Sequence, residues 1–212
     1  MKELVVVRHG EAEHTIKGIV GGWTDSILTD RGRHQIEITT TRLKELFGSR
    51  IEKIYTSDLK RASESAEIIN KQLGCPLEID SRFREFNWGG VAQGMSIEET
   101  EELALPVSEP LRDWIPYPEA ESWQMMYDRV AEVLSEIEQK QEEVVLIVGH
   151  GNTNCAIVEW WLQLPLRFPV DFIFDFASIS WLGISHFGQR EIRKLNETAH
   201  LMNEGLDDSV QQ

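Results

Sequence analysis

The sequence is short of basic residues and of cysteine, and it has no long uninterrupted apolar run. Lysine and arginine number 21 against 36 aspartates and glutamates, which gives a formal net charge of -15. Non-specific binding to nucleic acid requires a basic surface, so we expect no nucleic-acid partner. The richest apolar stretch, FPVDFIFDFASISW, is interrupted by Asp171 and Asp175 and is too short to span a bilayer. We therefore expect no membrane partner either.

The small number of cysteines and the lack of linkers limit the organisation of the chain. Cys75 and Cys155 are far apart in apolar surroundings, which favours free thiols in a reducing compartment over a disulfide framework. No Pro/Ser-rich or low-complexity segment divides the 212 residues, so we expect a single domain over residues 1–212. The opening MKELVVVRHG leads directly from a short apolar run into polar residues, from which we expect no signal peptide and a cytoplasmic location.

Apolar runs alternate with helical patterns along the chain. The patterns predict strands over residues 4–9, 51–57, 76–80 and 144–150, and a terminal hairpin or pair of edge strands from 179–185 and 190–195. They predict helices over residues 30–47, 57–73, 122–140 and 151–164, the second of them capped by Ser57 or Asp58. Residues 81–121 are expected to be irregular and acidic. This alternation predicts an α/β three-layer sandwich, with a mostly parallel central sheet and helices on both faces.

Two of the predicted strands end in histidine followed by glycine, VVVRHG at His9 and LIVGHG at His150. If these strands are parallel neighbours, both imidazoles project into the crevice where α/β sheets bind ligands. Arg8 precedes His9, and Arg61 lies in the first turns of a helix that follows another strand end. The helix after His150 would add backbone N–H groups and a positive dipole end. This combination predicts a site for a tetrahedral dianion such as a phosphoryl group.

The same residues also have simpler interpretations. A lone histidine at a strand end is usually structural and an arginine on a helix is usually solvated, but two such strand ends in one chain favour a functional site. A metal site is disfavoured because two histidines need a further ligand and the flanking arginines would repel a cation. We therefore predict neither a metal nor a cofactor.

These residues resemble the histidine phosphatase superfamily, in the branch that also holds cofactor-dependent phosphoglycerate mutases (branch 1). Arg-His-Gly alone is a weak signal, but five blocks follow one another in the family's order with ungapped local spacing. The resemblance covers nearly the whole chain and predicts a phosphatase-type member. The blocks are VVVRHGE, GWTDSILTDRG, YTSDLKRASESAEII, FREFNWGGVAQG and VLIVGHGN.

The resemblance implies that His9 is the nucleophile and forms a phosphohistidine that water then hydrolyses. It implies that Arg8, Arg61 and His150 hold the phosphoryl oxygens while charge redistributes. Glu85, in FREFNWGG, matches the family's residue that protonates the leaving oxygen and later activates water.

A carboxyl in that role must hold a proton, and the flanking Phe83, Phe86 and Trp88 would provide apolar surroundings. We prefer Glu85 to Glu11, which is expected to orient a neighbour.

The chain departs from the family's pattern at two positions. Thr15 stands where many members have an asparagine that contacts the phosphate, and its hydroxyl can still donate one hydrogen bond. The pair Gly21-Gly22 stands where relatives often have a hydroxyl or amide side chain followed by glycine, so only backbone donation from Gly22 is retained. Thr15, Gly22, Gly151 and Asn152 are the expected substrate-binding residues.

The segment of about residues 86–121 is expected to cap the pocket and select the substrate. Between Met95 and Ser122 it carries eight carboxylates against one cation, Arg112, whereas a mutase needs extra cations for a phosphoglycerate carboxylate and a bisphosphorylated cofactor. The eight are Glu98, Glu99, Glu101, Glu102, Glu109, Asp113, Glu119 and Glu121.

We therefore predict a hydrolase of the histidine acid phosphatase type, a phosphomonoesterase acting on a small phosphorylated molecule. Its leaving group is expected to be neutral, apolar or cationic, with candidate contacts from Trp88, Trp114, Tyr117 and Trp123. The alternatives are a phosphoglycerate mutase-type phosphotransferase and a low-turnover module that binds phosphorylated ligands or a protein. A homodimer is left open by the sequence.

Overall fold

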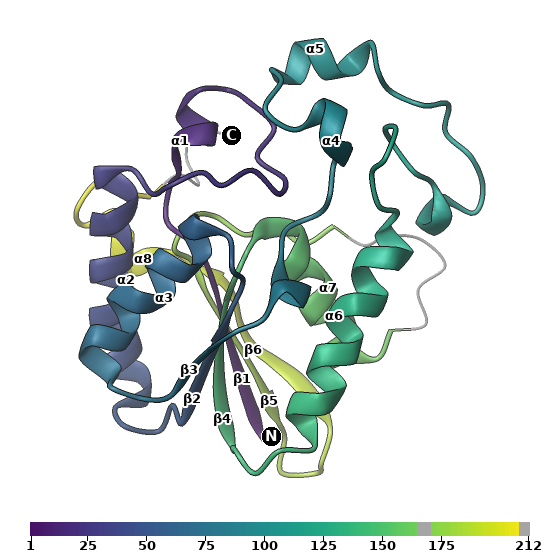
Figure 1. Ribbon diagram of the computed structural model, residues 1–212. Helices are drawn as coiled ribbons and strands as arrows, with labels where there is room; N and C mark the ends of the chain where they lie inside the picture. The colour runs from purple at the N-terminus through teal and green to yellow at the C-terminus, as the bar shows by residue number, and fades with distance from the viewer. Residues whose placement is uncertain (165–170, 208–212) are drawn as a thin grey trace.

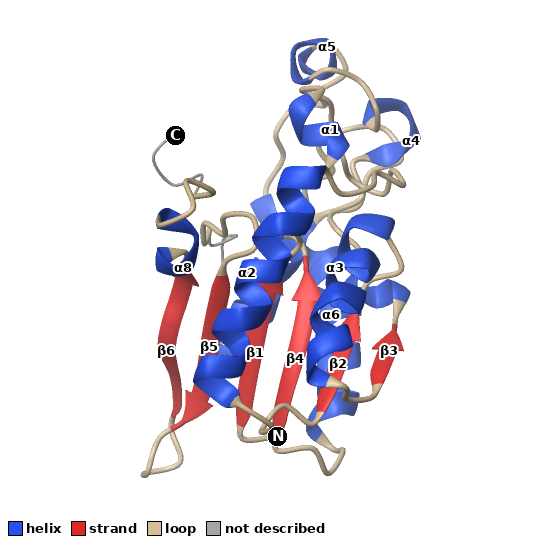
Figure 2. Cartoon of the chain, turned by 90° about the vertical axis from the view of Figure 1, so that its left-hand side faces the viewer, coloured by secondary structure: helices blue, strands red, loops and turns tan. Residues whose placement is uncertain are grey.

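The computed structural model describes residues 1–164 and 171–207, which form an α/β sandwich. Its centre is a six-stranded sheet in the order β3-β2-β4-β1-β5-β6. β3, β2, β4 and β1 run parallel, and β5 pairs antiparallel with β1 and with β6 (Figure 2). The strands are β1 (Glu3–Arg8), β2 (Lys53–Thr56), β3 (Leu77–Ile79), β4 (Val144–Gly149), β5 (Ile179–Ile184) and β6 (Arg190–Glu197). The last two form the predicted terminal hairpin.

Helices cover both faces of the sheet (Figure 1). Side chains of α2 (Asp30–Phe47), α3 (Lys60–Leu73) and α8 (Ala199–Met202) share one apolar core with Val5 and Val7 of β1. Side chains of α6 (Trp123–Glu138) and α7 (Gly151–Leu162) share the other core with Leu4 and Val6. Successive residues of a strand point to opposite faces, so a strand covered on both sides is apolar throughout. The predicted three-layer fold is confirmed.

β1 and β4 are adjacent and parallel, with Arg8 paired to Gly149 at their carboxyl ends. The backbone N–H of His9 continues the ladder by donating to the carbonyl oxygen of Gly149 at 3.0 Å. Both strands therefore stop at the same level, and the histidine after each lies at the same edge of the sheet.

The predicted start of the second helix is wrong. α3 begins at Lys60, and its N-cap residue is Leu59, which makes no side-chain cap. The carboxylate of Asp58 is held instead by the guanidinium of Arg84, with N–O distances of 2.8 and 2.5 Å. The hydroxyl of Ser57 accepts from the N–H of Leu59, which closes a tight turn before the helix. By contrast, α2 begins as predicted after Thr29, whose hydroxyl accepts from the N–H of Gly32.

The segment expected to be irregular contains several short helical turns: η1 (Ser81–Phe83), α4 (Gly89–Ala92), α5 (Ile97–Glu101) and η2 (Leu111–Asp113). A capping box between Ser96 and Glu99 closes the start of α5. Together with α1 (Glu13–Ile16), α4 and α5 lie beyond the carboxyl ends of the parallel strands (Figures 1 and 2). Residues 86–121 are called the cap below.

Arg112, the cation of the cap, is buried and pairs with Glu159 of α7 at 3.1 Å, and its Nε donates to Gln124 of α6. The η2 turn of the cap is thereby fastened to both helices of one face. The described residues contain no helix long and apolar enough to cross a membrane. Part of the FPVDFIFDFASISW stretch, Phe168 to Val170, lies outside the described residues.

Candidate active site

The two histidines that follow β1 and β4 lie side by side in the core of the site. His9 is 2% exposed and His150 is fully buried. Their ring centroids are 5.1 Å apart, with the rings at 65° to each other. The parallel register of the two strands therefore produces the juxtaposition that the sequence predicts.

The tautomer of His9 is fixed by its own loop. Its Nδ1 lies 2.7 Å from the carbonyl oxygen of Gly10, and because a carbonyl can only accept, Nδ1 carries the hydrogen. The lone pair is then on Nε2. Burial, with the positive charges of Arg61 and Arg8, lowers the pKa of His9 well below its ordinary value. The ring is neutral at pH 7, which is the nucleophilic form.

His150 combines complete burial with unused hydrogen-bonding capacity. Its pKa is lowered mainly by burial, then by Arg61, His9 and Arg8, so this ring is neutral as well. Neither ring nitrogen has a hydrogen-bond partner among the residues that the structure describes. Buried polar atoms are normally paired, and a phosphoryl oxygen held between the two imidazoles would provide a partner.

Two arginines supply positive charge next to these rings. Arg61 is 1% exposed, and it donates to the carbonyl oxygens of Thr24 at 2.9 Å and Gly22 at 2.6 Å. Burial lowers the pKa of Arg61 to about 10, so it remains charged at pH 7. The guanidinium of Arg8 stacks on the ring of Phe176, 4.0 Å from its centroid. Gly22 thus contributes by orienting Arg61, and its φ of 44° is in the region that favours glycine.

The carboxylate of Glu85 lies at the start of α7. It accepts from the backbone N–H groups of Asn152 at 3.2 Å and Thr153 at 3.3 Å, and from that of Phe86 at 2.8 Å. A Cβ on Gly151 would lie 3.7 Å from a Glu85 oxygen and 3.8 Å from Cζ of Arg8, so Gly151 separates the acid from the cation. The surroundings of Glu85 are richer in hydrogen-bond donors than the aromatic neighbours in the sequence suggested.

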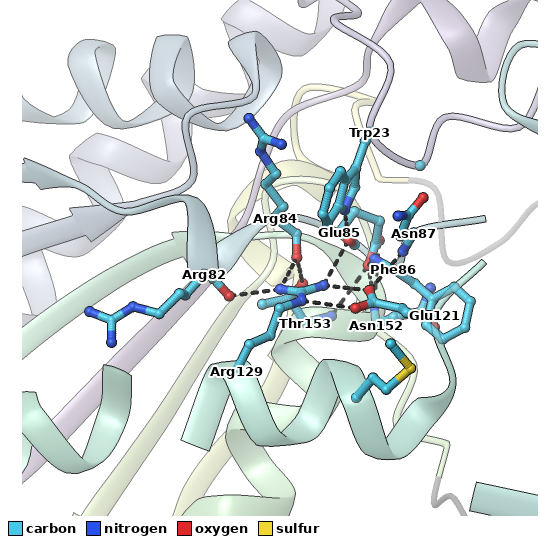
Figure 3. Close-up of polar contacts among 12 residues, drawn as sticks. Trp23, Arg82, Arg84, Glu85, Phe86, Asn87, Glu121, Arg129, Asn152 and Thr153 are labelled. Carbon is cyan, nitrogen blue, oxygen red and sulfur yellow. Dashed lines mark hydrogen bonds and ion pairs between the residues drawn. The ribbon is translucent and has the colours of Figure 1, made fainter. Parts of the chain in front are cut away.

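The loop that carries Glu85 is held by Arg129 of α6 (Figure 3). Arg129 donates to the carbonyl oxygens of Arg82 at 2.7 Å, Arg84 at 2.8 Å and Glu85 at 2.9 Å. It also pairs with the buried carboxylate of Glu121 at 2.6 Å.

Trp23 adds a bond from its indole N–H to the carbonyl oxygen of Glu85 at 2.6 Å (Figure 3). The backbone of the proposed acid is therefore fixed from two sides. Sequence reasoning missed Arg129 and Trp23 in this role, because bonds to backbone carbonyls leave no motif.

Thr15 and Glu11 lie outside the centre of the site. The side chain of Thr15 is exposed on α1, with its hydroxyl 3.4 Å from Nε2 of His14. Glu11 accepts from the hydroxyl of Thr29 at 2.6 Å and pairs with Arg31 at 3.1 Å, which agrees with an orienting role. His14 itself lies near His9, with ring centroids 6.3 Å apart, although sequence reasoning gave it no role.

A cavity of about 430 Å³ adjoins the site beneath the cap. All four aromatic residues named from the sequence line it, and so do Asn152 and Asp171: the four are Trp88, Trp114, Tyr117 and Trp123. Because the backbone of Asn152 also contacts the Glu85 carboxylate, the cavity begins next to this acid. Its described lining contains no lysine or arginine.

Within residues 1–164 and 171–207, no group of three or more histidine, cysteine, aspartate or glutamate side chains is placed to hold a metal ion. The described site consists instead of neutral imidazoles, guanidinium groups and one carboxylate. Fold and site together define an α/β protein whose buried guanidinium and imidazole groups, at the carboxyl ends of parallel strands, suit an anionic ligand such as a phosphoryl group.

The chain belongs to the histidine phosphatase superfamily (branch 1), whose family model matches residues 4–198. This confirms the family predicted from the sequence and, with it, the predicted class of phosphoric monoester hydrolase.

Individual relatives carry both phosphatase and mutase names. The chain is 33% identical over 162 residues to putative phosphoserine phosphatase 2 of Hydrogenobacter thermophilus, covering 74% of this chain and 77% of the relative. It is 34% identical over 168 residues to probable phosphoglycerate mutase GpmB of Escherichia coli, covering 78% of this chain and 77% of the relative. Among solved structures, the mycobacterial glucosyl-3-phosphoglycerate phosphatase complexed with VO3 superimposes with a TM-score of 0.77 at 25% identity, covering 93% of this chain and 100% of that one.

Because His9 and His150 are buried as neutral rings, we expect the folded chain to lose stability on acidification. The pKa values of His9 and His150 are lowered in the folded chain, so below the unfolded pKa of about 6.5 the unfolded chain binds more protons. Their contribution to stability is complete above that pH and is lost as the pH falls, by up to about 1.4 kcal/mol per histidine and pH unit. We expect the free energy of unfolding in urea to fall between pH 7.5 and pH 5, and to fall less in His9→Gln.

Val6→Ala provides the control, because it should lower the free energy of unfolding equally at both pH values. An equal decline in His9→Gln and the unchanged protein would contradict the prediction.

Proposed function

We propose that the chain hydrolyses small phosphate monoesters through a phosphohistidine formed on Nε2 of His9. The observation that carries this proposal is the state of His9: a buried, neutral ring whose Nδ1 is bonded to Gly10, beside a second neutral imidazole and two guanidinium groups.

In the first step the Nε2 lone pair of His9 attacks phosphorus and the bond to the ester oxygen breaks. Protonated Glu85 gives its proton to that oxygen, which leaves as an alcohol. Arg8, Arg61 and His150 bind the three remaining oxygens as charge accumulates on them.

In the second step Glu85 accepts a proton from water while the water oxygen attacks phosphorus. The P–N bond breaks, inorganic phosphate leaves and His9 is restored. The N–H groups of Asn152 and Thr153 stabilise the carboxylate between the two steps.

The aromatic cavity is the proposed site of the leaving group. It begins beside Glu85, the residue that would protonate the departing oxygen, and its walls are largely aromatic. Asp171 contributes a carboxylate to the lining, so a neutral or cationic group fits better than an anionic one. The family's mutase-type and binding-type members remain the alternatives to this phosphatase proposal.

A mutase would need cations for a second anionic group of its substrate. Arg112, the one cation between Met95 and Ser122, is committed to Glu159 and Gln124. Efficient isomerisation of 3-phosphoglycerate in the presence of 2,3-bisphosphoglycerate would contradict the phosphatase proposal. Cys75 and Cys155 form no disulfide, which supports a reducing compartment such as the cytoplasm. The homodimer stays a prediction.

Removal of the nucleophile tests the covalent step. With p-nitrophenyl phosphate, His9→Ala should lower kcat by at least about 1000-fold, because the proposed phosphohistidine cannot form without this imidazole. Acid quench after brief mixing with ³²P-labelled substrate should yield labelled protein from the unchanged chain and none from His9→Ala.

His34→Ala, at an exposed position on α2, is the matched control and should keep both activity and label. Label on His9→Ala would refute the assignment of the nucleophile. A complete lack of label on the unchanged chain would favour the binding-module alternative.

Replacement of the proposed acid should depend on the leaving group. Glu85→Gln should slow phenyl phosphate hydrolysis by about 100-fold or more, because phenolate is a poor leaving group without a proton. Nitrophenolate needs little protonation, so p-nitrophenyl phosphate should be affected much less in the phosphorylation step. Single-turnover rates for the two substrates measure the difference. Glu102→Gln, at an exposed position in the cap, is the control; an equal effect of Glu85→Gln on both substrates would count against the acid role.

The cavity can be tested with two phenolic esters that differ mainly in aromatic area. Trp114→Ala should lower kcat/KM for 1-naphthyl phosphate by about 10-fold, corresponding to one lost aromatic contact, and affect phenyl phosphate less. Phe187→Ala, which removes an exposed aromatic ring in the β5–β6 turn, should change neither value. Equal losses for the two esters would show that Trp114 does not contact the leaving group.

A further inference from the structure

His14 occupies a place in the site that its sequence context does not explain. It lies on α1, five residues after His9, with the two ring planes at 61° and the centroids 6.3 Å apart. Burial and the charges of Arg61 and Arg8 lower the pKa of His14 to about 3, so its ring is neutral and shares the two arginines that surround His9. The His14 ring therefore lies next to the position that a phosphoryl group bound to His9 would occupy.

The hydroxyl of Ser26 orients this ring. It accepts from the backbone N–H of His14 at 3.0 Å and lies 3.0 Å from Nδ1 of the same residue. When the hydroxyl hydrogen is donated to Nδ1, the ring hydrogen is on Nε2. The Nε2 edge is then a hydrogen-bond donor.

In the loop after α1, the lack of a side chain at Gly21 leaves space for the Nε2 edge of the His14 ring. A Cβ on Gly21 would lie 2.5 Å from Cδ2 and 2.6 Å from Nε2 of His14, so any side chain at position 21 would compete with the ring for the same space. The next residue, Gly22, holds Arg61 through its carbonyl oxygen. The imidazole of His14 therefore takes the place of a residue-21 side chain beside the arginine.

We propose that His14 is a phosphate-binding residue whose Nε2–H donates to a non-bridging phosphoryl oxygen, with Ser26 holding it in the donating tautomer. This assignment rests on the proposed function for the location of the phosphoryl group. A neutral donor adds a hydrogen bond for an oxygen without adding to the positive charge of Arg8 and Arg61, which repel each other.

The test is the affinity for orthovanadate, measured by isothermal titration calorimetry, together with kcat/KM for p-nitrophenyl phosphate. His14→Ala should weaken vanadate binding by about 10- to 100-fold, the range for one hydrogen bond to a charged group. Ser26→Ala should weaken it less, because it leaves the ring in place without a fixed tautomer. His14→Gln should recover part of the loss, since its amide is also a neutral donor.

A second variant separates binding from packing. In the His14→Ala background, Gly21→Ser places a hydroxyl in the vacated space and should restore part of the vanadate affinity. Gly21→Ser alone should lower the affinity, because the side chain meets the His14 ring. Gly21 does not have a left-handed φ, so serine is compatible with its backbone. Thermal unfolding of each variant reports any purely structural effect.

Vanadate affinity of His14→Ala within twofold of the unchanged chain would overturn the proposal, and so would a lack of any restoration by both Gly21→Ser and His14→Gln. His34→Ala is the control and should bind vanadate normally. Vanadate binding needs no turnover, so a failure at His14 is distinguishable from a failure of the proposed function, which would appear as an active His9→Ala or an inactive unchanged chain.

Discussion

The parallel pairing of β1 with β4 holds the site together. The two strands are in register from Glu3 with Val144 to Arg8 with Gly149. Because side chains alternate along a strand, a slip of one residue would exchange the residues in the two apolar cores. Val5 and Val7 would then face α6 and α7, and Leu4 and Val6 would face α2 and α3. The same slip would part His9 from His150, so the packing that stabilises the sheet also fixes the distance between the imidazoles.

The position of Glu85, the proposed acid, depends on a different set of contacts. Glu85 is carried by a loop rather than by a strand, and a loop is positioned only by what bonds its backbone. Arg129 and Glu121 form a partly buried ion pair, and the guanidinium also donates to three carbonyl oxygens. Desolvation of such a pair is costly, but here the additional bonds satisfy the arginine and order the loop. The position of Glu85 therefore depends on α6, whereas the position of His9 depends on the pairing of the strands.

Sequence patterns predicted the parts of the structure that follow from periodicity. The apolar strands, the four long helices and the convergence of His9 with His150 are of this kind, because burial on both faces of a parallel sheet leaves a clear pattern. The predicted start of α3 was wrong because the carboxylate of Asp58, a residue type that often caps helices, accepts hydrogen bonds from Arg84 instead. Arg84 is distant from Asp58 in the sequence, so no local pattern reveals this contact. The cap's short turns escaped prediction because a helix of a few residues is stabilised by its contacts rather than by its own sequence.

His14 was missed for a related reason: its place is set by Ser26 and Gly21, which the fold brings to it.

The distribution of charge links the acidic composition to substrate choice. Of the eight cap carboxylates, Glu121 is buried against Arg129 and the other seven are exposed, so the surface of the cap is acidic. Arg8 and Arg61 lie deeper, where low polarity strengthens their attraction for a phosphoryl dianion. A substrate with its charge confined to the phosphoryl group gains this attraction in full. A second anionic group would remain near the cap and Asp171, where the described cavity offers it no cation. The acidic cap surface and the lack of a cation in the described cavity lining therefore both support the proposed preference for esters whose leaving group is uncharged or positive.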